Sequence, residues 1–155
     1  MWKHAGPGSF ARNALAAVGV AALLATSALA ANAAAANDAE LTIFDGVYTD
    51  EQADRGKDMF ASDCAACHGN TARGGPGSPG LIAFTLDSKY ADQPLSAYWD
   101  FMVHNMPPGN AGWFTDQEYA DITAYLLQLH GAPAGENELE GTEEALSQIM
   151  IVPTP

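Results

Sequence analysis

The clearest pattern of apolar and polar positions lies at residues 115–131. It opens with TDQE, in which Thr115 and Glu118 have the spacing of a capping box, and it ends at Gly131, a residue type that commonly stops a helix. Between these ends, apolar residues recur at helical spacing: Tyr119, Ile122, Tyr125, Leu126 and Leu129. The pattern predicts an amphipathic helix with one face buried in a core.

A second helix is predicted to open at Thr49 and to run to about Cys64. The letters TDEQ place Thr49 and Gln52 at capping-box spacing, with the acidic residues Asp50 and Glu51 in the first turn. The carboxylates in that turn would interact favourably with the positive end of the helix dipole.

A third helix is predicted over residues 95–104, directly after Pro94. Its apolar face would hold Leu95, Trp99 and Met102. Residues 69–80, GNTARGGPGSPG, predict an irregular loop, and a weak helix is expected over residues 142–149. No strand pair joined by a tight hairpin turn is indicated, so the expected fold class is all-α with long loops.

The start of the chain has the order of a secretory signal peptide. Basic Lys3 and Arg12 are followed by an apolar run over residues 14–30, and the first acidic residue comes later, at Asp38. Ala28-Leu29-Ala30 and Ala31-Asn32-Ala33 both fit the cleavage rule, so the expected cut is uncertain by a few residues. An uncleaved anchor is the alternative, but the run is short for a membrane span of about 20 apolar residues. We expect cleavage and a periplasmic protein.

The rest of the chain, about 120 residues, suits one domain. Without Lys3 and Arg12, four basic residues remain against 19 acidic ones, a balance of −15. Such a chain is not expected to bind nucleic acid, and it should dock on basic partners with an attraction that salt weakens. The expected organisation is a signal peptide at 1–30, a mobile lead-in at 31–46, a folded domain at 47–131 and an acidic tail at 132–155.

The only two cysteines lie in CAACH, at residues 64–68. A disulfide of this spacing belongs to thioredoxin-like domains, which need strand–helix alternation that is missing here. A zinc site would need further ligands, for which only His104 and His130 remain, in no recognisable pair. Covalent attachment of c-type haem is the third interpretation, and C-x-x-C-H is its signature. We favour haem, because Cys64 and Cys67 would meet its two vinyl groups and His68 would bind its iron.

Six side chains are candidates for the second axial position of a haem iron: Met59, Met102, Met106, Met150, His104 and His130. Met106 is favoured because Pro107 and Pro108 follow it. A proline pushes the preceding residue into an extended conformation, and a loop stiffened by two prolines could present the thioether at low entropic cost.

These motifs resemble the class I c-type cytochromes with a single haem. VYTDEQADRGKDMFASDCAACHG, NMPPG and YADITAYLLQLHG are similar to cytochromes associated with quinone-cofactor alcohol dehydrogenases, and the resemblance covers nearly all of residues 47–131. It implies the class I cytochrome c fold, with helices and loops around one covalently attached haem c. It also implies thioether bonds at Cys64 and Cys67 and axial ligation by His68 and Met106.

The resemblance further implies a contact between the first and last helices and a partner for the proximal histidine. Gly56 and Phe60 would meet Ile122 and Tyr125, and a glycine suits such a close approach. A proline carbonyl would accept the ring N–H of the histidine. Pro79 fits this role best, and Pro76 is the rival.

An electron carrier is the favoured function, because histidine–methionine ligation leaves no open iron position and raises the reduction potential. Electrons would pass between a dehydrogenase, such as one with a quinone cofactor, and a terminal oxidase or another cytochrome. The first alternative is a dedicated haem subunit of a periplasmic dehydrogenase complex. The second is a haem peroxidase or gas-binding cytochrome with an open sixth site.

Overall fold

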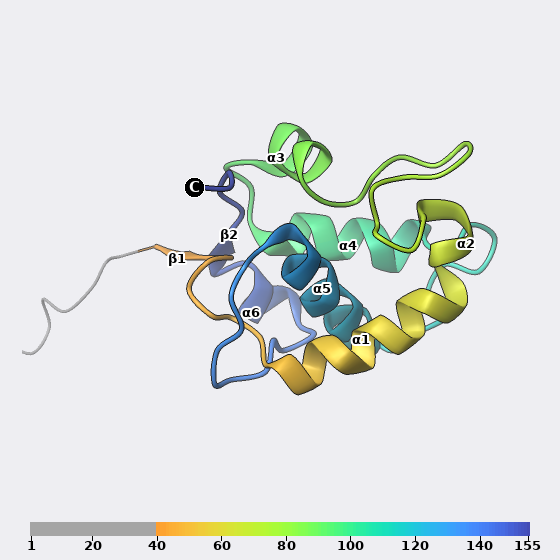
Figure 1. Cartoon of the computed structure of the whole chain (residues 1–155). Helices are drawn as coiled ribbons and strands as arrows, with labels where there is room; N and C mark the ends of the chain where they lie inside the picture. The colour runs from red at the N-terminus through yellow and green to blue at the C-terminus, as the bar shows by residue number, and fades with distance from the viewer. Residues whose placement is uncertain (1–39) are drawn as a thin grey trace, which may run out of the picture. The chain divides into compact units, whose positions relative to one another are not determined.

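The three principal helices of the computed structural model agree closely with those expected from the sequence. α1 covers Asp50–Asp63, α4 covers Leu95–Asn105 and α5 covers Asp116–His130 (Figure 1). The model describes residues 40–155, so the expected signal peptide lies outside the described residues. None of the helices in residues 40–155 combines the length and the apolar character that a membrane span requires.

Local capping explains where α1 and α5 begin. At α5 the predicted capping box is complete, since Glu118 N donates to Thr115 Oγ1 at 3.3 Å and Thr115 N donates to Glu118 Oε2 at 2.8 Å. At α1, Thr49 Oγ1 accepts from Gln52 N at 3.2 Å. The second half of the predicted α1 box is missing, because the Gln52 side chain points to other partners.

Short elements complete the described structure. α2 covers Ala65–His68, α3 covers Phe84–Tyr90, and α6, at Glu143–Leu146, is shorter than the expected helix over 142–149. The sequence did not predict α3, which buries only Leu86 and Tyr90, too few positions to establish a period. The strands β1 (Leu41–Thr42) and β2 (Ile149–Met150) pair in parallel, a contact between distant segments that needs no hairpin turn.

The crossing of α1 and α5 is as close as the sequence predicted. A Cβ atom at Gly56 would overlap the main-chain carbonyl group of Asp121, so only glycine fits at this contact. One turn further along α1, the ring of Phe60 lies 5.5 Å from the ring of Tyr125, centroid to centroid. α5 also contacts α4, so it lies between α1 and α4 (Figure 1).

The expected division of the chain at residues 47 and 131 does not appear in the described residues. Residues 40–155 lie in one compact unit, and residues from the expected lead-in and tail are buried in its core. These buried residues are Ile43, Ala132, Leu139, Leu146, Ile149 and Ile151. The segment after residue 131 is therefore not a solvated tail, although all of its charged residues are acidic.

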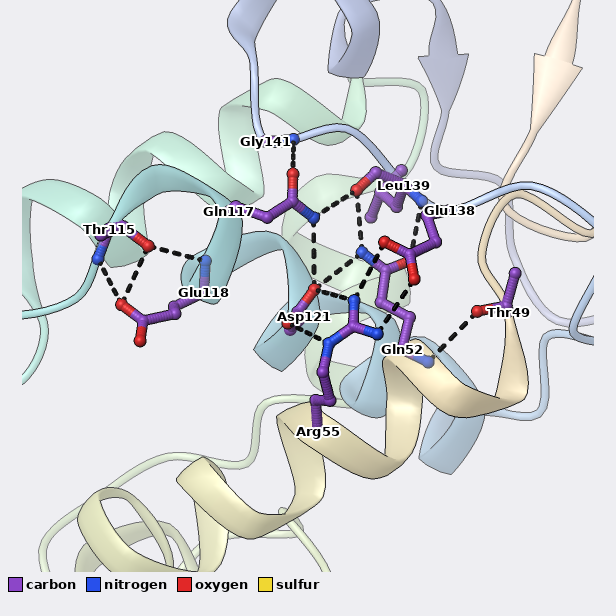
Figure 2. A network of polar contacts seen from close by, with 10 residues as sticks. All are labelled: Thr49, Gln52, Arg55, Thr115, Gln117, Glu118, Asp121, Glu138, Leu139 and Gly141. Carbon is purple, nitrogen blue, oxygen red and sulfur yellow. Dashed lines mark hydrogen bonds and ion pairs between the residues drawn. The ribbon is translucent and has the colours of Figure 1, made fainter.

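A polar network fastens this C-terminal segment to the crossing of α1 and α5 (Figure 2). Arg55 Nε lies 2.8 Å from Asp121 Oδ2, and Arg55 Nη1 lies 2.9 Å from Glu138 Oε1. Gln52 Nε2 donates to Leu139 O at 2.8 Å, while Leu139 N donates to Gln52 Oε1 at 2.7 Å. These bonds explain why Gln52 does not complete the α1 capping box.

Candidate haem-binding site

The CAACH motif forms the junction between α1 and α2. Cys64 N donates to Phe60 O at 2.9 Å at the end of α1, and His68 N donates to Cys64 O at 3.0 Å in the next turn. This turn places Cys64, Cys67 and His68 on the wall of one cavity of about 620 Å³. The motif therefore forms part of the wall of this cavity.

Cys64 and Cys67 are not joined by a disulfide bond in the structure, and the surroundings of Cys64 show what kind of thiol it is. Burial raises the pKa of the Cys64 thiol to about 11, helped by the nearby Asp63 carboxylate. Reactive dithiols have the opposite property, a pKa lowered by neighbouring positive charge. In residues 40–155 there is no group of three or more His, Cys, Asp or Glu side chains placed to hold a metal ion. The environment of the Cys64 thiol therefore differs from that of a reactive dithiol.

The ring of His68 is buried and held by a main-chain carbonyl group. Its Nδ1 lies 2.9 Å from Pro79 O. A carbonyl oxygen only accepts, so Nδ1 carries the proton and the lone pair of the ring is on Nε2. Pro79, and not Pro76, thus occupies the position of the histidine partner. A bond of this kind orients a metal-binding imidazole and strengthens it as a ligand.

The loop that carries Pro79 is folded tightly against the CAACH turn. Gly74 N donates to His68 O at 3.0 Å, and Gly75 N donates to Ser78 O at 3.1 Å. A Cβ atom at Gly75 would overlap the carbonyl oxygen of Cys67. The glycines of the loop therefore let the main chain approach the motif closely enough to bring Pro79 to the ring of His68.

Met106 ends α4 in the extended conformation that its two following prolines predicted, with φ −127° and ψ 142°. Its carbonyl oxygen accepts from Tyr119 Oη at 2.5 Å, so α5 helps to fix the loop. Met106, Pro107 and Pro108 all line the cavity that Cys64, Cys67 and His68 line. The structure thus brings together all the residues that the sequence assigned to the site.

Of the six candidates for the second axial position, all within the described residues, Met102 and Met106 line the cavity. His104 lies on the exposed face of α4, where its Nδ1 is 3.0 Å from Asp100 Oδ1. The ring of His130 is buried elsewhere, with Nδ1 accepting from Ala83 N at 3.0 Å and Nε2 lying 3.3 Å from Asp87 Oδ1. Burial lowers the pKa of His130, an effect that Asp87 opposes.

Aromatic residues that the sequence did not assign to the site form much of the remaining cavity wall. Tyr98 is buried on α4, its hydroxyl donates to Leu81 O at 2.9 Å, and burial raises its pKa well above the ordinary value. Phe114 and Tyr119 pack edge to face, with centroids 5.5 Å apart. Aromatic residues are frequent between residues 90 and 119, but their spacing did not indicate that they line a common pocket.

The cavity has the properties that a haem group requires. Its volume lies within the range of about 300–1,000 Å³ that is usual for cofactor sites, and its walls are mostly apolar. Two thiols, one correctly oriented imidazole and two thioether side chains are among the groups that line it. The donor set therefore fits a covalently attached haem c.

Comparison with known proteins agrees with this fit. Residues 51–126 match the family model described as cytochrome C oxidase, cbb3-type, subunit III. The match covers α1, the CAACH motif, α4 and most of α5. The match covers just under half of the chain, and together with the helices around the cavity it confirms the predicted all-α class I cytochrome fold.

Curated relatives carry similar stretches. The chain is 37% identical over 82 residues to the cbb3-type cytochrome c oxidase subunit CcoP of Rubrivivax gelatinosus, covering 52% of this chain and 27% of that protein. It is 32% identical over 83 residues to the thiosulfate dehydrogenase of Psychrobacter arcticus, covering 49% and 25%. It is also 32% identical over 91 residues to the cytochrome bc1 complex cytochrome c subunit of Corynebacterium efficiens, covering 59% and 30%. The chain thus spans less than a third of the length of these relatives.

Proposed function

We propose that this chain is an exported c-type cytochrome with a single haem, which carries single electrons between a dehydrogenase and a downstream respiratory acceptor. The observation that supports this most strongly is the meeting of CAACH, the His68–Pro79 bond and the extended Met106 at one cavity. A bound haem c would supply an iron that gains and loses one electron.

The side chains around the cavity have separate roles in this proposal. Cys64 and Cys67 would hold the cofactor through thioether bonds. His68 would bind the iron through Nε2, because Pro79 O holds the proton on Nδ1. Met106 would be the second iron ligand, and the bond from Tyr119 to its carbonyl oxygen limits its movement. The apolar wall would keep water from the metal, and electron transfer needs no acid, base or nucleophile.

The absorption spectrum of the mature protein tests this function directly. Protein from cells able to assemble c-type haem is expected to hold one covalent haem per chain. In the oxidised state it should show the weak far-red band of an iron–methionine bond. A high-spin band would instead favour the peroxidase or gas-binding alternative, and wild-type protein of apo mass would contradict the proposal.

The partner is proposed to be a redox protein with a basic docking patch, such as a quinone-cofactor dehydrogenase, a terminal oxidase or another cytochrome. After the expected signal peptide, four basic residues stand against 19 acidic ones, and this supports the proposal because such a surface attracts cations over long distances.

Electron transfer with the natural partner is expected to slow steeply as salt rises from low to physiological concentration. Screening acts over about 8 Å at physiological ionic strength, and steering of this kind changes association rates by roughly ten- to a thousandfold. A stopped-flow series against ionic strength measures the effect. A rate that stays flat or rises with salt would show that docking is apolar and that the acidity serves solubility.

A dedicated haem subunit of a periplasmic dehydrogenase complex is the second candidate. Two relatives are named as subunits of an oxidase and of a bc1 complex, which favours a role within an assembly. Co-purification from native membranes and periplasm distinguishes the two. A free carrier elutes alone, whereas a subunit elutes with a dehydrogenase at constant ratio.

A further inference from the structure

Lys89 is a lysine on the wall of the cavity. It is the next-to-last residue of α3, and its ammonium group lies 4.7 Å from the centre of the Phe101 ring and 5.3 Å from the centre of the Tyr90 ring. All three residues line the cavity. A cation near two aromatic faces is attracted to both, so the ammonium is directed to one place although Lys89 is exposed.

This ammonium has no carboxylate partner in residues 40–155. The ion pairs found there join Arg55 to Asp121 and Glu138, and two histidines to aspartates. Asp63 also lines the cavity, but it does not pair with Lys89. In a chain with only four basic residues after its expected signal, a lysine with no counter-ion at the cofactor cavity calls for an explanation.

We propose that Lys89 would pair with a carboxylate of the bound haem and so keep a positive charge at the wall of the cofactor cavity. The inference rests on the proposed function, since it concerns the cofactor of the same cavity. Haem c carries two propionate groups, and an ammonium group is a suitable partner for either. Phe101 and Tyr90 would hold the ammonium in place before the cofactor arrives.

The charge has a direct electrostatic consequence. The oxidised haem centre carries one more positive charge than the reduced one, so a nearby ammonium disfavours oxidation and raises the reduction potential. Lys89 is exposed, and solvent therefore weakens its effect, but the low dielectric of an apolar cavity preserves part of it.

The test measures the midpoint potential of the haem-containing protein by spectroelectrochemical titration. Lys89→Met keeps a long apolar side chain against the two rings and removes the charge. It is expected to shift the equilibrium between reduced and oxidised protein by about three- to tenfold toward the oxidised form. Lys89→Arg keeps the charge and should return the potential close to that of the wild type.

Lys57→Met is the matched control, because Lys57 is also exposed and without an ion pair but does not line the cavity. It should shift the equilibrium much less than Lys89→Met. Equal shifts in the two variants would overturn the inference, since the charge would then act only as part of the surface. An equal fall in Lys89→Arg and Lys89→Met would also overturn it. Because every variant is measured with its haem bound and its iron–methionine band intact, such a result would leave the proposed function standing.

Discussion

Replacement of Cys64 or Cys67 by alanine is expected to abolish stable covalent haem attachment. Each substitution removes one of the two sulfurs that the turn from α1 to α2 places on the cavity wall. The product should be apo protein, or protein with one unstable thioether. Denaturing gels stained for haem and intact-mass spectrometry measure the loss.

Ser62→Ala is a suitable control for the cysteine variants. Ser62 lies two residues before Cys64 and is exposed, and its hydroxyl donates only to the carbonyl oxygen of Asp58 in its own helix. This variant should keep its haem. If both cysteine variants retained full covalent haem, the site assignment would be wrong.

The second large effect is expected from Met106→Ala. Loss of the thioether should open the iron to carbon monoxide or cyanide, and the iron–methionine band should disappear. The reduction potential should fall on the order of 100 mV, a fraction of the ≈0.8 V over which axial ligands set haem potentials. Ligand-binding spectra and a potentiometric titration measure both changes.

Met102→Ala separates the two methionines that line the cavity. Met102 is 6% exposed, so its loss should lower stability by about 2–5 kcal/mol through cavity formation. The iron–methionine band should nevertheless survive in the folded protein. If the band vanished in Met102→Ala and survived in Met106→Ala, the assignment would pass to Met102.

The sequence predicted most of what depends on near neighbours. The complete capping box of α5 joins Thr115 and Glu118, three residues apart, and Gly131 ends the helix with a positive φ of 103°. The extended conformation of Met106 follows from the ring of the next residue. In these cases the interacting atoms lie within one helical turn of each other, so the local sequence alone predicts the conformation.

The same local reasoning failed where a side chain found hydrogen-bond partners far away along the chain. Gln52 has the right spacing to cap α1, yet its side chain bonds to Asp121 and Leu139, which lie 69 and 87 positions away. The acidic residues after residue 131 suggested a tail outside the folded domain. The structure instead buries Leu139, Leu146 and Ile151 on the core formed by earlier helices.

By itself, the sequence determined the three main helices, the CAACH motif and the likeness to class I cytochromes, because caps, periodicity and motif spacing are local properties. Only the tertiary structure showed that Pro79 O lies beside the His68 ring, and that Met102 and Met106, of the six axial candidates, line the cavity. It also revealed Lys89 between two aromatic rings. These contacts depend on how glycine-rich loops and helices pack against one another in space. The spacing of residues along the chain does not determine that packing.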